Sequence, residues 1–369
     1  MLNVLDYLLG IWTMLSKYLF PFLGKASQIA FGIFVAILVF GFMIFIHEFG
    51  HYIVARLCKV TVLEFAVGMG PKLLSRTSKK TGIVYSLRAF PIGGFTAMEG
   101  EDGENVDPDA LVNKPRWQRF LVLIAGSMMN LITGTLAMLL YLSITLNVGS
   151  RVVAQFRDNS ISQDSGLAVG DEIVRINGEN MISYNDVMYK IMFDGCEPLE
   201  LTVIRDGETV VLKDVVFPTE EVDGVEYGVA DFLFQGVRPT ISVLLRQTMT
   251  QSVATVKVIY KSLAELITGR FGIRGVSGPV GTVSVISEAA KTGFSSVVYL
   301  FSFISLNLGI MNLLPIPALD GGRLLFLLVE AVRRKPLDPR LEGYVNLAGM
   351  VLLLAFMAIV TVIDVIKLV

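Results

Sequence analysis

The chain has 369 residues, of which 53% are hydrophobic and only 17% are charged. Soluble domains carry about 25% charged residues, so a large part of this chain is expected to lie in lipid. Its 31 basic residues nearly balance its 33 acidic ones, which excludes a protein that binds nucleic acid through a basic surface.

Residues 1–27 are predicted to form an amphipathic helix at the membrane interface. Polar residues recur every three or four positions between Asn3 and Lys17, which places a narrow polar stripe on an otherwise apolar helix. The segment lacks the basic start and small-residue cleavage site of a secretory signal peptide. A fifth membrane span over the same residues is the alternative.

Four segments are long and apolar enough to cross a bilayer, which takes about 20 residues. We predict transmembrane helices over residues 28–58, 117–147, 297–322 and 344–369. The connections over 59–116 and 323–343 are rich in lysine and arginine, so the positive-inside rule predicts that both are cytoplasmic. The long polar stretch 148–296 is then expected on the outer side.

The cytoplasmic connection 59–116 is predicted to contain a small β-sheet. Its strand-like runs are Val60–Val67 and Gly82–Phe95, and Gly68 and Gly70 follow the first run as turn residues. Non-helical backbone is tolerated at membrane depth only where protein covers it or where it lines a cavity. We therefore expect this sheet to lie against the helix bundle.

The outer stretch is predicted to begin with a compact β-rich domain over 148–220. A hairpin signal, Asp206-Gly207, joins two strand patterns, and a helical pattern precedes them near residues 184–192. Residues 221–296 are predicted to be a linker with an amphipathic helix over 240–268.

The chain has only two histidines, and both lie in the first predicted span, in the run His47-Glu48-Phe49-Gly50-His51. Four-residue spacing places both imidazoles on one helix face, where they can bind a single zinc ion, with Glu48 placed to take a proton from water. Ionisable residues in a span cost on the order of 2.5–3.5 kcal/mol each and are usually functional. A purely structural histidine pair is the alternative, but it leaves Glu48 unexplained.

A catalytic zinc usually has three protein ligands, so a carboxylate or Cys58 must supply the third. Asp320 is the strongest candidate, because Pro315 and Pro317 break the helix just before it at the end of the third predicted span. A helix cap, or an ion pair with Arg323, would be a structural role for the same carboxylate.

Asn307 and Asn312 place two amide side chains in the third predicted span. They can bond to a neighbouring helix, as is common in membranes. They can equally present hydrogen bonds to an extended polypeptide held beside the metal. The spacing does not distinguish these roles.

The chain resembles the bacterial site-2 proteases, which are regulated intramembrane zinc metalloproteases, in the branch with a single extracytoplasmic PDZ domain. The resemblance runs from about residue 29 to 368 and involves several motifs in the same order. These are His47–His51, Glu64–Lys72, Phe90–Glu101, the PDZ-like Gly166–Gly178, Gly275–Gly281 and Asn307–Gly322.

The resemblance implies a polytopic α-helical membrane protein with four core transmembrane helices, a membrane-associated β-sheet and an inserted PDZ-like α+β domain. Its cofactor would be Zn²⁺, held by His47, His51 and Asp320, with Glu48 as the general base. The implied substrate-binding residues are Asn130, Asn307, Asn312, Pro315 and Pro317. Around Asn130 the chain reads Gly-Ser-Met-Met-Asn, whereas the family commonly has proline after the glycine.

The implied activity is hydrolysis of peptide bonds in or near the transmembrane segment of single-span membrane proteins. It would be the second cut of regulated intramembrane proteolysis, on anti-sigma factors or signal-peptide remnants. The implied location is the bacterial inner (plasma) membrane. The PDZ-like domain outside would act either as a size filter or as a docking surface for substrates. A metal transporter is disfavoured because no inverted repeat is present, and a membrane scaffold would not need the three motif residues together.

Overall fold

The computed structural model describes residues 25–100, 107–145, 148–222, 225–238, 240–269, 276–335 and 337–368. The predicted interfacial helix over residues 1–27 lies outside this part of the chain, except for its last three residues, which begin the first described helix. The chain divides into two compact units, one formed by Met1–Gly134 with Ser277–Val369 and the other by Thr135–Val276.

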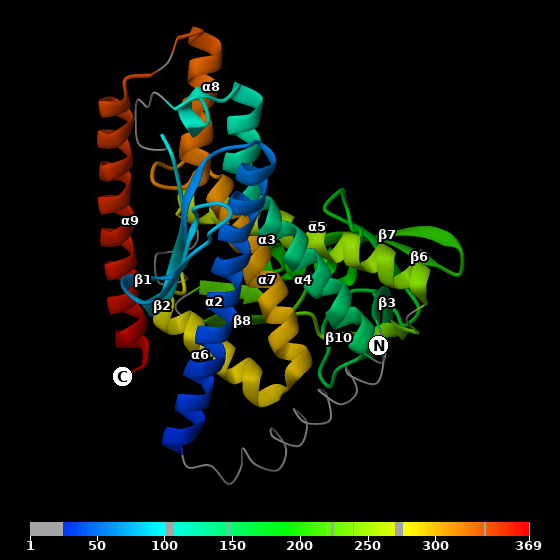
Figure 1. Ribbon diagram of the computed structural model, residues 1–369. Helices are drawn as coiled ribbons and strands as arrows, with labels where there is room; N and C mark the ends of the chain where they lie inside the picture. The colour runs from blue at the N-terminus through cyan, green and yellow to red at the C-terminus, as the bar shows by residue number, and fades with distance from the viewer. Residues whose placement is uncertain are drawn as a thin grey trace. The chain divides into compact units, whose positions relative to one another are not determined.

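The first unit is built mainly from apolar helices (Figure 1). They are α2 (Lys25–Leu57), α3 (Arg116–Ile144, which continues into the second unit), α6 (Pro279–Thr292), α7 (Phe294–Leu313), α8 (Asp320–Arg333) and α9 (Pro339–Leu368), with a short 3-10 turn at Leu111–Asn113. Within the described residues, α2, α3, α7 and α9 are long and apolar enough to cross a membrane. The chain is therefore a multi-pass membrane protein with four candidate spans, as predicted.

The structure differs from the prediction at the end of the third span. The predicted span 297–322, with its helix broken at Pro315 and Pro317, was to be followed by a loop over 323–343. Instead α7 ends at Leu313, and a separate helix, α8, begins at Asp320. Two prolines in the six intervening residues remove backbone donors and restrict φ, which ends α7. The segment 323–343 is consequently helical as far as Arg333, rather than a loop throughout.

The predicted sheet is present as β1 (Val62–Thr77) and β2 (Val84–Met98), which lie beside α2 in Figure 1. Val67 of β1 lies opposite both Leu87 and Gly94, whereas the end of β1 pairs with the start of β2. Strand β1 therefore reverses direction near Gly68, whose φ of +84° is readily available only to glycine. The first half of β1 consequently lies between the two halves of β2.

An ionic cluster holds the two strands together around Glu64. Its Oε1 accepts hydrogen bonds from Ser86 Oγ at 2.6 Å and Arg88 Nη2 at 2.8 Å, and its Oε2 pairs with Lys72 Nζ at 2.9 Å. Burial alone would raise the pKa of Glu64, but these donors lower that pKa to about 2. Because the pKa of Glu64 is lower in the folded protein, its ionised carboxylate stabilises the fold. This contribution is fully present above the ordinary glutamate pKa of about 4.3, and it is lost as the pH falls through the pKa of the folded state.

The second unit is an α+β structure. Its strands are β3 (Val148–Phe156), β4 (Glu172–Ile176), β5 (Glu179–Asn180), β6 (Leu199–Arg205), β7 (Glu208–Val215), β8 (Thr219–Val222), β9 (Val225–Gly228) and β10 (Phe232–Val237), and its helices are α4 (Tyr184–Asp194) and α5 (Ile241–Ile267). One sheet has the order β10-β3-β4-β6-β7, with β5 paired to β4, and β8 pairs with β9.

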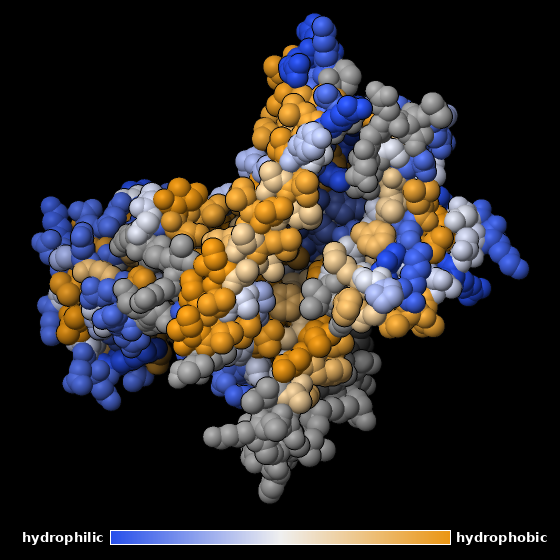
Figure 2. Space-filling view, turned by 90° about the vertical axis from the view of Figure 1, so that its left-hand side faces the viewer, coloured by the Kyte–Doolittle hydropathy of each residue, from blue (hydrophilic) through white to orange (hydrophobic). Residues whose placement is uncertain are grey.

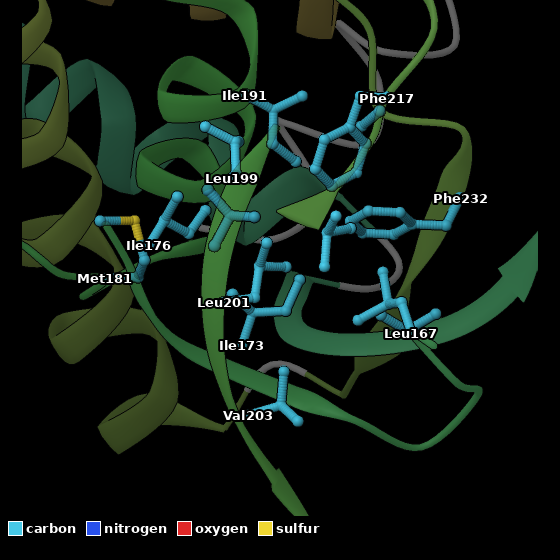
Figure 3. Close-up of a cluster of buried hydrophobic side chains, with 14 residues drawn as sticks. Leu167, Ile173, Ile176, Met181, Ile191, Leu199, Leu201, Val203, Phe217 and Phe232 are labelled. Atoms are coloured by element: carbon cyan, nitrogen blue, oxygen red, sulfur yellow. The ribbon is translucent and has the colours of Figure 1, made fainter. Parts of the chain in front are cut away.

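The core of this unit is a cluster of buried side chains from the sheet and α4 (Figure 3). Ile173, Ile191 and Leu201 are fully buried, and burying each such side chain contributes about 1.5–3 kcal/mol. Phe232 also belongs to this core, because β10 pairs antiparallel with β3. The β-rich structure therefore continues beyond residue 220, where the sequence analysis placed a linker.

Helix α9 exposes most of its side chains, and Figure 2 shows exposed apolar side chains gathered in patches. An exposed apolar surface of this kind is typical of a site that contacts a membrane or another protein. Among the described contacts, buried Asp364 of α9 accepts hydrogen bonds from the backbone N–H groups of Gly278 at 3.2 Å and Gly281 at 2.7 Å. This carboxylate from another helix caps the N-terminus of α6, which explains the glycines of the Gly275–Gly281 motif in its described part.

Candidate metal centre

Three potential metal ligands converge in the first unit. His47 Nε2 and His51 Nε2, one turn apart on α2, lie 3.3 Å from each other. Asp320 Oδ2, from the first residue of α8, lies 3.3 Å from the former and 3.4 Å from the latter. Within the described residues these three side chains form a group that can hold a metal ion.

The spacing of the three atoms fits zinc. Zinc–nitrogen and zinc–oxygen bonds of about 2.0–2.1 Å in a tetrahedron put neighbouring ligand atoms about 3.3–3.4 Å apart. The Nδ1 atom of His51 donates to the carbonyl oxygen of Val122 at 2.8 Å, which fixes the tautomer and leaves Nε2 with a lone pair directed at the group. The donor set therefore suits a tetrahedral cation whose fourth position is open.

The carboxylate of Glu48 is held from the β-sheet. Thr96 of β2 lies 3.0 Å from both Glu48 Oε2 and the Glu48 backbone oxygen, and its hydroxyl donates toward them. Close approach of strand and helix depends on Gly94, where an added Cβ would lie 2.9 Å from Ala66 O and 3.2 Å from Glu48 Cγ. The run Gly93-Gly94 thus allows the sheet to reach the side chain next to the first histidine.

Helix α3 closes the other side of the group. A Cβ added at Gly126 would lie 2.3 Å from His51 Nε2 and 2.7 Å from a carbon of the His47 ring, so only glycine fits there. Ser127 Oγ donates to Asp320 Oδ2 at 3.3 Å, and Asn130 Nδ2 lies 3.2 Å from His47 Nδ1. Neither Ser127 nor Thr96 was predicted from the sequence as a site residue. Ser127 could have been found as a polar residue that follows Gly126 within an apolar span.

The position of Asp320 is set by the backbone of the segment before it. Ala318 has a φ of +73°, and its N–H donates to Asn346 Oδ1 of α9 at 3.2 Å. A Cβ added at Gly321 would lie 2.0 Å from the carbonyl oxygen of Leu314. This tight turn aims the first side chain of α8 at the two histidines, and its positive φ at a non-glycine residue is the strain expected near a functional site.

The other predicted site residues lie on α7 and in the turn between α7 and α8, apart from Cys58. Asn307 and Asn312 are half-buried on α7, and neither amide makes a side-chain hydrogen bond within the described part of the chain. Pro315 and Pro317 lie in the turn that leads to Asp320. Cys58, the alternative third ligand, lies in a hydrophobic cluster and is not part of the donor group.

Comparisons with known proteins identify the family. The model of peptidase family M50 matches residues 35–356. A protein of Clostridium acetobutylicum, ascribed by its name to the zinc metalloproteases, is 37% identical over 340 residues, covering 91% of this chain and 98% of its own length. The zinc metalloprotease RasP of Bacillus licheniformis is 33% identical, covering 88% of this chain and 96% of its own length.

A third relative is the regulator of sigma-W protease RasP of Bacillus subtilis, which is 31% identical and covers 88% of this chain and 96% of its own length. These matches extend over most of the chain, and the range matched by the family model contains the positions of His47, Glu48, His51 and Asp320. They agree with the predicted resemblance to site-2 proteases. The chain belongs to peptidase family M50.

Proposed function

We propose that this chain is a zinc metalloendopeptidase that hydrolyses peptide bonds in or near the transmembrane segment of single-span membrane proteins. The observation that carries the proposal is the group formed by His47, His51 and Asp320 at zinc-ligand spacing. Both histidines and the neighbouring Glu48 belong to an apolar helix long enough to cross a membrane. Membership of a peptidase family and the names of the relatives support the metalloprotease activity.

In this proposal His47, His51 and Asp320 hold Zn²⁺, which when bound supplies a Lewis acid that polarises the scissile carbonyl and makes water more acidic. Glu48 takes the proton from the attacking water as the new C–O bond forms. It then delivers that proton to the leaving amine nitrogen as the C–N bond breaks. Atoms and charge balance with one water consumed per peptide bond.

The substrate must unwind before it is cut, because a helix shields its carbonyls with internal hydrogen bonds. We propose that β1 and β2 receive the unwound segment by strand addition, which supplies backbone hydrogen bonds with little demand on sequence. Asn307 and Asn312, whose amides are unpaired among the described residues, would bond to that segment, and Pro315 and Pro317 would shape the site beside it.

The proposed setting is the bacterial inner membrane, with the sheet on the cytoplasmic side. The second unit would be a PDZ-like domain on the outer side that admits only substrates already shortened there. The Bacillus subtilis relative is named a regulator of sigma-W protease, which favours an anti-sigma factor over a signal-peptide remnant as substrate. The activity would then be the second cut of regulated intramembrane proteolysis.

Metal removal tests this function. We expect the full-length protein in lipid vesicles to cleave a single-span reporter, to stop after treatment with 1,10-phenanthroline, and to recover when stoichiometric zinc is restored. Mass spectrometry of the products should place the cut within or at the edge of the apolar segment. Cleavage that persists without metal, or a cut confined to soluble parts of the reporter, would refute the proposal.

Loss of the Thr96 hydroxyl should slow the chemical step. A hydrogen bond to a charged group is worth about 1.5–3 kcal/mol, so Thr96→Val should lower kcat about 10-fold or more by freeing the Glu48 carboxylate. KM and zinc content should stay unchanged, because the side chain bonds to the base and not to the metal group. Kinetics on the same reporter measure this.

Thr96→Ser is the matched control, since it keeps the hydroxyl and should retain wild-type kcat. Equal rates for the valine variant and the wild type would mean that this contact has no part in catalysis.

A further inference from the structure

Each of the three proposed ligands has a second bonding partner, and all three partners belong to α3. His51 Nδ1 donates to Val122 O, Asp320 Oδ2 accepts from Ser127 Oγ, and His47 Nδ1 lies 3.2 Å from the amide of Asn130. A carbonyl oxygen points along the helix axis toward the next turn, so Val122 O lies near Gly126. Val122 O, Ser127 and Asn130 therefore lie on one side of α3, within about 100° around the helix axis.

Asn130 is fully buried, and its Oδ1 is one of the buried polar atoms without a hydrogen-bond partner in the described structure. A buried polar group left unpaired is destabilising, so its presence in an apolar span calls for a functional reason. Its backbone is held firmly, because Ser305 Oγ of α7 donates to the Asn130 carbonyl oxygen at 2.8 Å. The amide is therefore fixed against the His47 ring.

The identity of the amide atom that faces His47 follows from the chemistry of the ring. If Nε2 binds a metal, Nδ1 carries the hydrogen and must donate it. The oxygen and nitrogen of an asparagine amide are exchanged by a half-turn of the amide group, and the hydrogen-bond network decides between the two orientations. The donor at Nδ1 selects the orientation in which Oδ1 faces the ring.

We propose that Asn130 and Ser127 are positioning residues for the metal site rather than substrate-binding residues. Asn130 Oδ1 accepts the hydrogen of His47 Nδ1, which fixes the plane and tautomer of that ring. The Ser127 hydroxyl holds Asp320. Val122 O performs the same task for His51, so one side of α3 orients all three ligands. This inference rests on the proposed zinc-binding role of those ligands.

The test is the zinc affinity of the purified full-length protein in detergent, measured by competition with a chromophoric chelator, with no substrate present. Loss of an outer partner of a metal ligand typically weakens metal binding 10–100-fold, so we expect that loss for Asn130→Ala. Asn130→Asp keeps an acceptor for Nδ1–H and should hold zinc as tightly as the wild type. Ser127→Ala is a second variant and should weaken binding through Asp320.

The matched control is Ser143→Ala, which removes a hydroxyl from an exposed position of the same helix, where it donates to Leu140 O. It should bind zinc like the wild type. Cobalt-substituted protein supplies a second readout, since the visible spectrum reports ligand geometry and should change in N130A but not in S143A.

The outcomes separate this inference from the function it rests on. Wild-type affinity in N130A would overturn the inference alone. So would equal weakening in N130A and N130D, because a packing defect would then account for both. A wild-type protein that binds no zinc would overturn the proposed function and the inference with it.

Discussion

Replacing Glu48 with glutamine should reduce kcat for reporter cleavage by about 10²–10⁴-fold, the usual contribution of a general base. The glutamine keeps the shape of the side chain and can still accept the Thr96 hydrogen bond, but it cannot take a proton from water. His47, His51 and Asp320 are untouched, so the zinc content should remain at the wild-type level. Cleavage in vesicles and metal analysis of the same preparation measure both quantities.

Glu288→Gln is the matched control for this substitution. Glu288 is exposed on α6 and pairs only with Lys291 among the described contacts, at 2.8 Å. The Glu288→Gln protein should therefore cleave the reporter at the wild-type rate. Equal rates for all three proteins would show that cleavage comes from a contaminating protease or needs no base at position 48.

Replacing Asp320 with asparagine should release the metal and bring cleavage to background. The carboxylate contributes the only negative charge within the three-ligand group, and an amide is a much poorer zinc ligand. The loss of zinc affinity should therefore exceed the 10–100-fold cost typical of an outer partner. Metal analysis after dialysis, together with cleavage of the reporter, measures the effect.

Cys58→Ser tests the other third ligand that the sequence allowed. Cys58 packs in a hydrophobic cluster with Ala55 and Val60, so its replacement should leave the zinc content unchanged. If the cysteine variant lost its metal while D320N kept it, the proposed ligand set would be wrong. Such a result would also return Asp320 to the role of a helix cap.

The sequence predicted the parts of this fold that depend on local pattern. Apolar length alone locates the four candidate spans, because a bilayer imposes the same requirement on every crossing helix. The pairing of His47 with His51 follows from helical periodicity. The hairpin at Asp206-Gly207 follows from turn chemistry. Each of these signals lies within a few residues of the feature it predicts.

Features that depend on distant contacts were not predictable in the same way. Strand β10 joins the sheet through β3, from which it is separated by the rest of the domain, so no local pattern marks it as part of that core. The contacts of Thr96 with Glu48 and of Ser127 with Asp320 join segments far apart in sequence. Asn130 was identified as a site residue, but its contact with His47, which suggests a different role, required the fold.

The separation of Asp320 from the histidines has a consequence for biosynthesis. The helix that carries His47 and His51 leaves the ribosome before α8 does. On the proposed ligand set, a nascent chain therefore carries an incomplete metal site until Asp320 has been added. A chain that has not yet reached Asp320 is therefore expected to cleave nothing, even though both histidines and Glu48 are already in place.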